Sequence, residues 1–269
     1  MGRGWSVFSP SDCCSAIAES LPERSPHPLG ACPVLRDGWV IRTEAERPWI
    51  ILCHGVGSNR SNLLLVASGL HEAGLNLLLF DFRAHGTSGG LQTSFGWREQ
   101  RDLEGALAYL SHQPDVAARP YGVYGSSMGG AVALLVAARD ERIGAVAVES
   151  PYANLEETIS RHLTLMYPVA SNVLCRWLVL ATYRIWFGVW PRRVSPESSV
   201  ARLAPRPLLL IHGDQDVRIA LASLRRLYER AGDPKARWVI QGAGHLEGLE
   251  ADPRAYVERL AGFFELRTA

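Results

Sequence analysis

Short apolar runs recur along the chain and alternate with longer stretches whose apolar residues follow helical spacing. A short apolar run bounded by turn-forming residues is typical of a buried strand, whereas apolar residues one helical turn apart are typical of a helix packed on one face. This pattern predicts strands at residues 49–53, 76–80, 121–124, 143–148, 208–211 and 237–240. It predicts helices at residues 61–73, 97–111, 130–139, 220–231 and 252–264.

The order of these elements predicts the fold class. Strands that alternate with helices form βαβ units and therefore a mostly parallel sheet. The predicted strands are continuous apolar runs, as expected when helices cover both faces of the sheet. We therefore predict an α/β fold with a mostly parallel, doubly wound sheet, in which ligands bind at the carboxyl ends of the strands.

Residues 152–200 interrupt the alternation, because they separate the fourth predicted strand from the fifth by far more than a crossover needs. The segment is rich in aromatic residues, namely Tyr167, Trp177, Tyr183, Trp186, Phe187 and Trp190. We interpret it as a helical cap insertion over the carboxyl edge of the sheet, where it could supply an apolar substrate pocket. The alternative is an extra helical layer that packs on the sheet.

The first 38 residues differ from the rest of the chain. They are rich in Pro, Ser and Cys and show no clear period, so residues 1–38 are predicted to be a poorly defined leader. Residues 39–269 then form one domain, as the length of 269 residues and the ordinary globular composition also indicate. The net charge of +1 argues against a surface dedicated to nucleic acid.

The cysteines and the apolar runs bear on cellular location. Five scattered cysteines show neither a disulfide framework nor the spacing of a zinc site, so we predict a reducing, cytoplasmic setting. No secretory signal is visible, and no uninterrupted apolar run is long enough to span a bilayer. Residues 1–6 formally fit a myristoylation pattern, and Cys13 and Cys14 could be acylated. Membrane association is therefore possible but not expected, because such short motifs often match by chance.

The pentapeptide GSSMG at residues 125–129 lies between a predicted strand and a predicted helix. A G-x-S-x-G sequence in this context is typical of a nucleophile elbow, a turn so tight that glycine is needed on both sides of the serine. Ser127 has the two glycines, whereas a frame on Ser126 would place Tyr124 and Met128 there. The alternative is that Ser127 is an ordinary helix N-cap.

A nucleophilic serine needs a histidine base and a carboxylate that orients the base. In chains with this elbow the carboxylate follows the serine and the histidine comes last. His245 lies in a glycine-lined loop directly after the last predicted strand, and Asp214 and Asp216 follow the fifth predicted strand. We favour Asp216 as the acid because it reaches further along the loop, whereas Asp214 could serve the turn itself.

The oxyanion that forms during acyl transfer needs hydrogen-bond donors. The predicted donors are the backbone amides of Met128, directly after the serine, and of Val56, in the loop after the first predicted strand. The helix after Ser127 would also direct its N-terminus at the developing negative charge. The eight histidines lack ligand spacing, so we predict no metal site.

Five motifs, in this order, resemble the α/β-hydrolase superfamily: HGxGxN at 54–59, DxRxHGxSxG at 81–90, GxSMGG at 125–130, HGxxD at 212–216 and GxGH at 242–245. More closely, the chain resembles the cap-bearing serine hydrolases grouped with alpha/beta-hydrolase-domain esterases and serine-aminopeptidase-like lipases. The resemblance implies a catalytic triad of Ser127, Asp216 and His245 and no cofactor. It also implies a structural role for the loop that carries Asp81, Arg83 and His85, in which Ala84 departs from the glycine common in relatives.

We therefore predict a serine hydrolase that cleaves a carboxylic ester or thioester through an acyl-serine intermediate, with an apolar acyl group. A serine nucleophile argues against the dehalogenases and epoxide hydrolases of this fold, which need a carboxylate at that position. The alternatives are a peptidase or amidase on the same scaffold and a non-catalytic binding protein that retains the fold. The expected partner is a small-molecule ester or acyl substrate; the sequence leaves the acyl chain length and the oligomeric state open.

Overall fold

Eight strands form one sheet in the computed structural model, which describes residues 17–21, 36–43, 47–113, 116, 120–168 and 172–268. The strands are β1 (Ile17–Leu21), β2 (Arg36–Ile41), β3 (Trp49–Cys53), β4 (Asn76–Phe80), β5 (Tyr121–Ser126), β6 (Ile143–Glu149), β7 (Leu208–Gly213) and β8 (Lys235–Ile240). Their order across the sheet is β1-β2-β4-β3-β5-β6-β7-β8. The pairings that involve β2 are antiparallel and all the others are parallel. The prediction of an α/β fold with a mostly parallel sheet is confirmed.

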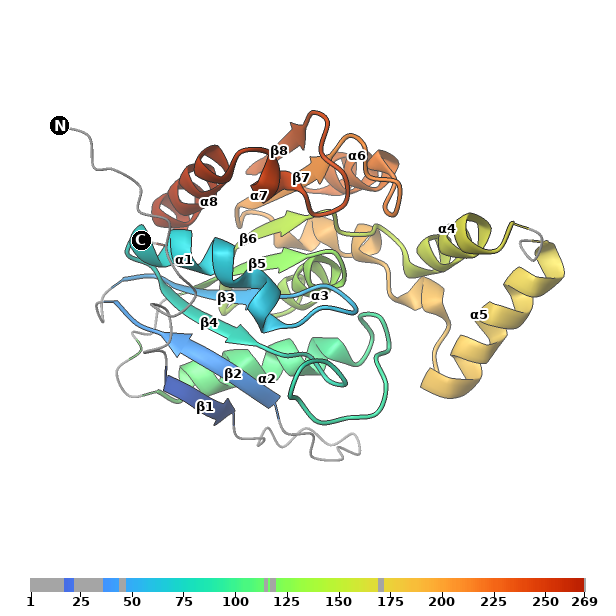
Figure 1. Cartoon of the computed structure of the whole chain (residues 1–269), viewed down its shortest axis with the longest axis horizontal. Coiled ribbons are helices and arrows are strands. Elements are labelled where there is room, and N and C mark those ends of the chain that lie inside the picture. The colour runs from blue at the N-terminus through green and yellow to red at the C-terminus, as the bar shows by residue number, and fades with distance from the viewer. Residues whose placement is uncertain are drawn as a thin grey trace.

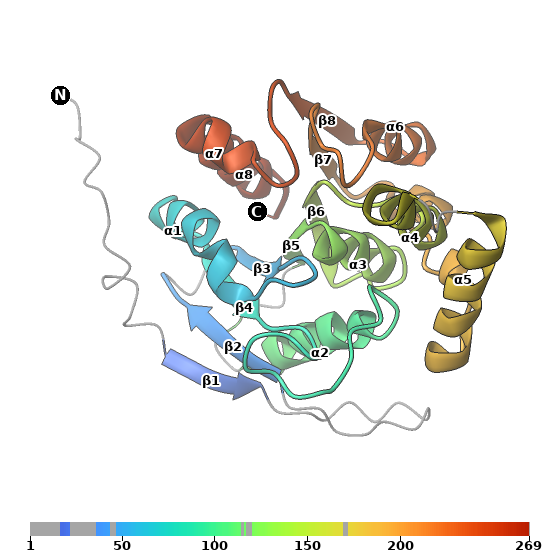
Figure 2. The ribbon, with the colours of Figure 1, turned by 45° about the vertical axis from the view of Figure 1, so that its right-hand side comes forward.

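Helices cover both faces of the sheet (Figures 1 and 2). Those of the body are α1 (Leu64–Glu72), α2 (Glu99–Ser111), α3 (Met128–Ala137), α6 (Leu221–Arg230), α7 (Gly248–Ala251) and α8 (Pro253–Thr268). One apolar core lies between the sheet and α1 and α8, and the other lies between the sheet and α2, α3 and α6. Within β3, Ile50 and Leu52 join the first core and Ile51 and Cys53 the second. Because both sides are apolar, a central strand such as β3 is apolar and buried at every position.

The hydrophobic pattern does not predict β1 and β2. β1 lies within the segment predicted to be a leader, and β2 begins near its end. β2 starts with Arg36, Asp37 and Gly38 and so lacks a continuous apolar run; it is held in the sheet by its backbone pairing with β4. The motifs for lipid attachment at residues 1–6, Cys13 and Cys14 lie outside the described residues.

The insertion at 152–200 forms two helices and a return through short 3₁₀ turns. The helices are α4 (Leu155–Met166) and α5 (Val173–Phe187), and the turns are Pro191–Arg193, Pro196–Ser198 and Val200–Leu203. The side chains of Asn154 and Asn172 cap α4 and α5 by accepting hydrogen bonds from first-turn amides. A small apolar cluster that includes Leu155 and Tyr183 joins this insertion to Leu135 of α3. Both helices of the insertion stand beyond the end of the sheet toward which the parallel strands point (Figures 1 and 2).

Candidate active site

Ser127 lies in a sharp turn between β5 and α3, with a φ of 50° and a ψ of −113°. A positive φ is strained for a residue with a side chain, and the hydrogen bond of 2.8 Å from the Ser127 amide to the Glu149 carbonyl helps to hold it. The flanking glycines make the turn possible. A Cβ on Gly125 would lie 2.6 Å from the Gly129 carbonyl carbon, and a Cβ on Gly129 would overlap the Cys53 carbonyl oxygen. Since Ser127 makes no side-chain cap hydrogen bond, it is not an ordinary N-cap.

The structure brings Ser127, His245 and Asp216 together from the ends of three different strands, β5, β8 and β7. The Nε2 atom of His245 lies 3.1 Å from Ser127 Oγ, and its Nδ1 atom lies 2.7 Å from Asp216 Oδ2. Because an ionised carboxylate only accepts hydrogen bonds, His245 carries its proton on Nδ1. Its Nε2 atom is then free to accept the proton of the Ser127 hydroxyl.

Asp216 is a buried carboxylate held by several donors. Its Oδ1 atom accepts hydrogen bonds from the backbone amides of Arg218 and Ile219, each at 2.9 Å. Burial raises the pKa of Asp216, but the hydrogen bonds from His245 and from the Ile219 amide outweigh burial, and the pKa is lowered overall. Asp216 is therefore ionised at neutral pH and can stabilise an imidazolium at His245.

Asp214 has a different partner. Its Oδ1 atom accepts a hydrogen bond of 2.7 Å from the Gly242 amide, so it ties the loop after β7 to the loop that carries His245. The sequence favours Asp216 over Asp214 without excluding the latter. The geometry gives the contact with the imidazole to Asp216 and leaves Asp214 to bridge the two loops.

We expect Asp216→Asn to lower kcat for ester hydrolysis about 10⁴-fold, because an amide no longer holds His245 in the required tautomer or stabilises its charge. Asp214→Asn is the matched control: it keeps an oxygen that can accept from the Gly242 amide, so most of the activity should remain. Steady-state kinetics with p-nitrophenyl butyrate, together with thermal unfolding of both variants, measures the difference. Equal losses in the two variants would contradict the assignment.

The predicted oxyanion donors lie in segments next to the serine. The loop after β3 passes close to Ser127, since a Cβ on Gly55 would lie 3.4 Å from Ser127 Cβ. Val56 follows Gly55 in this loop, and Met128 is the first residue of α3. The amides of the first helical turn have no partner within a helix. The α3 N-terminus can therefore favour negative charge at Ser127.

Two histidines hold the loops around these donors. His85 Nε2 accepts a hydrogen bond of 3.2 Å from the Gly57 amide, directly after Val56. His54 Nε2 accepts one of 3.0 Å from the Phe82 amide, and burial lowers the pKa of His54 to about 4. A neutral His54 can act as an acceptor at physiological pH. The loop at 81–90 and the loop after β3 therefore brace each other.

The charged residues of the 81–90 loop are occupied by structural contacts. The Asp81 carboxylate accepts from the backbone amides of Arg60 and Thr87, at 2.7 and 3.0 Å, and forms an ion pair with the Arg60 side chain. Arg83 pairs with Asp102 across 2.6 Å. These contacts agree with the structural role that the sequence resemblance implies for this loop. Among the described residues, no group of three or more His, Cys, Asp or Glu side chains could hold a metal ion.

Glu149, at the end of β6, is a buried carboxyl group beside the site that the sequence analysis does not single out. Its Oε2 atom accepts from the hydroxyls of Tyr124 and Tyr256, at 3.1 and 2.8 Å, and its Oε1 atom accepts from the Gly248 amide at 3.0 Å. Burial raises the pKa of Glu149. Because Gly248 follows closely after His245, this network anchors the histidine loop to the centre of the sheet. A carboxylate directly after an apolar strand is the sequence signal that could have indicated it.

Comparison with known proteins places the chain in a family. The family model described as "Serine aminopeptidase, S33" matches residues 44–202. The chain belongs to this family of the α/β-hydrolase superfamily. The protein YqkD of Bacillus subtilis is 31% identical over 220 residues, which cover 80% of this chain and 70% of YqkD. Rv2307c of Mycobacterium tuberculosis is 30% identical over 218 residues, which cover 80% of this chain and 69% of Rv2307c.

Solved structures agree with this placement. The Pyrococcus furiosus esterase Pf2001 superposes with a TM-score of 0.75 at 25% sequence identity, covering 100% of this chain and 99% of that chain. The α/β hydrolase GrgF from Penicillium has a TM-score of 0.68 at 19% identity, with coverage of 87% and 95%. The second likeness concerns the fold alone. The α/β-hydrolase resemblance predicted from the five motifs is confirmed.

Proposed function

We propose that the chain is a serine hydrolase that cleaves a carboxylic ester or thioester through an acyl-serine intermediate. The observation that carries the proposal is the continuous contact from Asp216 through His245 to Ser127 Oγ, with separations of 2.7 and 3.1 Å. The family supports hydrolysis, and the Pyrococcus furiosus neighbour is described as an esterase. The fold by itself would not support it, because this fold carries many chemistries.

In the first half of the proposed reaction, Ser127 Oγ attacks the carbonyl carbon of the substrate while His245 Nε2 takes the hydroxyl proton. The amides of Val56 and Met128 hold the oxyanion, and Asp216 stabilises the imidazolium. His245 then gives the proton to the leaving alcohol or thiol as the C–O or C–S bond breaks. The acyl group remains on Ser127 as an ester.

In the second half, His245 takes a proton from a water molecule whose oxygen attacks the acyl carbon. The tetrahedral intermediate uses the same two amide donors. Its collapse breaks the bond to Ser127 Oγ, which recovers a proton from the imidazolium. The products are a carboxylic acid and the alcohol or thiol, with water as the co-substrate.

We further propose that the acyl group is apolar. Val56 lies in the oxyanion loop and Val217 directly follows Asp216, and the two side chains are 45% and 67% exposed. Exposed apolar side chains beside the reacting groups favour an acyl chain over a charged substituent, because binding removes apolar area on both sides from water.

The aromatic residues of the cap divide into two groups in the structure. Tyr183 is buried, donates a hydrogen bond of 2.8 Å to the Ser94 carbonyl and packs against Phe187 with ring centroids 4.6 Å apart. Trp177 and Trp186 are exposed instead. The reason is that α5 turns one face to the body, so aromatic residues on its other side cannot reach that face.

A substrate series tests the ester proposal against the rival peptidase or amidase, which the family description favours. We expect turnover of p-nitrophenyl esters, with kcat/KM rising about fourfold for each methylene added beyond acetyl until the pocket is filled. Aminoacyl p-nitroanilides should be poor substrates. Hydrolysis of the anilides alone would support the rival, and a preference for acetyl or charged esters would contradict an apolar acyl site.

We also propose that the protein works in a reducing, cytoplasmic setting. Among the cysteines that the structure describes, Cys53 and Cys175 are both free thiols. Burial raises the pKa of the Cys53 thiol, which keeps it protonated and unreactive. Free thiols of this kind are typical of proteins from reducing compartments.

A further inference from the structure

The outward side of α5 is apolar, which is the reverse of an ordinary surface helix. Its exposed large apolar residues are Val173, Leu174, Trp177, Leu178, Val179, Ile185 and Trp186, and we call these seven residues the cap surface. Val173 is 83% exposed and Ile185 is 78% exposed. A surface helix normally presents charged and polar residues to water. A contiguous apolar patch on a protein surface is instead typical of an interaction site.

The patch continues onto the neighbouring helix. Leu165, Met166 and Tyr167, at the C-terminal end of α4, are also exposed. α5 follows this end of α4 along the chain, and both helices stand at the outer end of the molecule (Figures 1 and 2). The cap surface is therefore placed where a flat partner could contact it without meeting the body of the domain.

The segment that contains α5 carries positive charge and no negative charge. Between Glu157 and Glu197 the sequence contains no Asp or Glu, but it contains arginines at positions 161, 176, 184, 192 and 193. Glu157 itself is already paired with Arg226, at 2.5 Å. An apolar helix flanked by arginines, with tryptophan on its exposed face, is typical of a helix that lies in a membrane interface.

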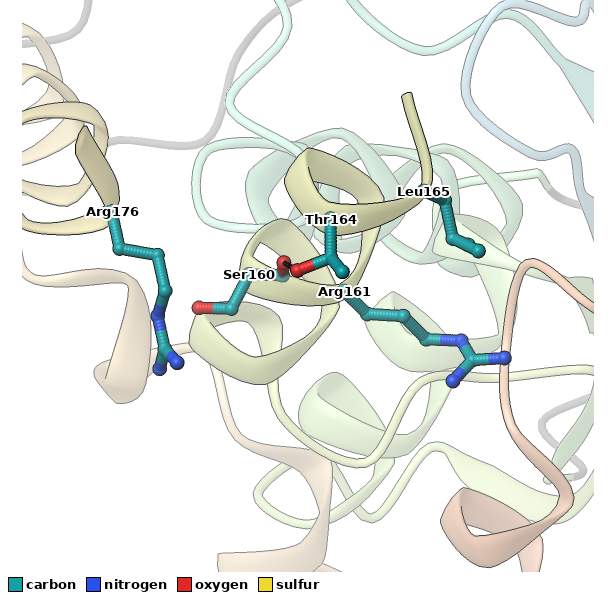
Figure 3. Close-up of a pocket in the computed structure, with 5 residues that line it drawn as sticks. All are labelled: Ser160, Arg161, Thr164, Leu165 and Arg176. Carbon is teal, nitrogen blue, oxygen red and sulfur yellow. Dashed lines mark hydrogen bonds between the residues drawn. The ribbon is translucent and has the colours of Figure 1, made fainter. Parts of the chain in front are cut away.

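A hollow of about 310 Å³ lies between the two cap helices and is lined by Ser160, Arg161, Thr164, Leu165 and Arg176 (Figure 3). Arg161 donates hydrogen bonds to the Val217 carbonyl, at 2.9 and 3.2 Å. In Figure 3, Arg161 extends to one side of α4, while Ser160 and Arg176 lie on the other side, facing each other across the gap. The Ser160 hydroxyl donates its proton to the Glu156 carbonyl, at 2.8 Å, so the guanidinium of Arg176 is the group that can donate to a phosphate oxygen here.

We propose that the cap surface docks onto an anionic membrane. α5 lies in the plane of the interface, with the cap surface among the acyl chains and its flanking arginines among the phosphate groups. The hollow beside Arg176 receives one lipid phosphate. Docking is peripheral: among the residues that the structure describes, no helix is long and apolar enough to cross a bilayer. Neither a lipid anchor nor the proposed hydrolysis is required for this docking.

A second copy of the chain fits the cap surface less well. A two-fold contact brings the same patch of both copies together. Arg176 and Arg184 of each copy would then face arginines, and the segment between Glu157 and Glu197 has no carboxylate to pair with them. Anionic lipid headgroups supply the missing negative charge, with each arginine near the surface contributing to the attraction.

Vesicle co-sedimentation of the full chain, produced without acylation, tests the proposal. We expect tighter binding to vesicles of phosphatidylcholine with phosphatidylserine than to phosphatidylcholine alone. Leu174→Gln should weaken binding about tenfold by removing a buried apolar side chain. The matched control is Leu65→Gln on α1, since Leu65 is also exposed, at 73%, but lies outside the cap. It should bind as the original chain does, and thermal unfolding should show both variants folded.

A separate variant tests whether the hollow binds a lipid phosphate. Arg176→Gln should lower the affinity for the anionic vesicles about fivefold, and raised salt should weaken binding of the original chain in the same direction. Unchanged affinity of Arg176→Gln would overturn the phosphate site. The docking itself would be overturned by absence of vesicle binding or by equal losses in Leu174→Gln and Leu65→Gln. It would also be overturned by a dimer in solution that Leu174→Gln dissociates and that does not bind vesicles.

Discussion

Ser127→Ala is expected to lower kcat for p-nitrophenyl ester hydrolysis about 10⁶-fold, which is the scale of loss when a triad nucleophile is removed. The hydroxyl is the proposed nucleophile, and His245 is its hydrogen-bond partner, at 3.1 Å. Alanine keeps the Cβ atom, so the strained φ of 50° at this position is unchanged. The thermal midpoint should therefore stay close to that of the original chain while the activity disappears.

Covalent labelling supports the same experiment with an independent signal. A fluorophosphonate should add its mass to one site of the intact protein, and peptide mapping should place the adduct on Ser127. The Ser127→Ala variant should not be labelled. Hydrolysis that persists unchanged in this variant would refute the mechanism, and an unlabelled, inactive original chain would favour a binding protein that retains the fold.

Gly129→Ala is expected to lower the free energy of unfolding by about 3 kcal/mol or more, as forced overlap in a packed site does. The new Cβ would overlap the Cys53 carbonyl oxygen and lie 2.6 Å from the His54 carbonyl oxygen. Both of these are backbone atoms of the central strand and its exit, so neither can rotate away as a side chain could. A loss of this size is a large part of the stability of a typical domain.

Gly105→Ala is the matched control, and it is expected to change the free energy of unfolding in the opposite direction. Gly105 lies inside α2, and a Cβ there meets nothing within 4 Å. Alanine should raise the free energy of unfolding by about 0.5–1 kcal/mol, because glycine loses more backbone freedom in a helix. Urea unfolding of both variants measures the contrast. Equal stability of Gly129→Ala and the original chain would show that the elbow tolerates a side chain and would contradict the packing described for it.

The six predicted strands are all present because each contains a short apolar run. The central strand β3 is buried at every position, and burial on both faces requires such a run. The strand β2 is missed for the opposite reason. It begins with Arg36, Asp37 and Gly38 and is held by pairing with β4, which is a contact distant in the sequence. A local hydrophobic pattern cannot predict a strand that is formed mainly by pairing with a neighbouring strand.

The predicted site residues are brought together by the chain order alone. Ser127, Asp216 and His245 follow β5, β7 and β8, which are parallel strands of one sheet, so their carboxyl ends lie at one edge of it. Glu149 and His85 are different, because their contacts with Gly248 and Gly57 join loops that are remote in the sequence. Their importance follows from burial and hydrogen bonding, which a sequence motif does not state.

The sequence by itself determined the fold class, the sharp strand-to-helix turn at Ser127 and the residues gathered at the carboxyl edge. It could do so because strand burial, glycine turns and βα order are properties of local pattern and connectivity. Only the tertiary structure decided between Asp214 and Asp216 at the imidazole, since that choice depends on distances of a few ångströms across two loops.

The tertiary structure also decided which apolar residues of α5 face water. The sequence of an apolar helix is the same whether its residues are covered or exposed. That Leu174 and Trp177 are exposed is known only from the way in which α5 packs on the body. From the sequence, membrane association is possible but not expected; the proposed docking of the cap surface rests on this exposure, which the structure supplies.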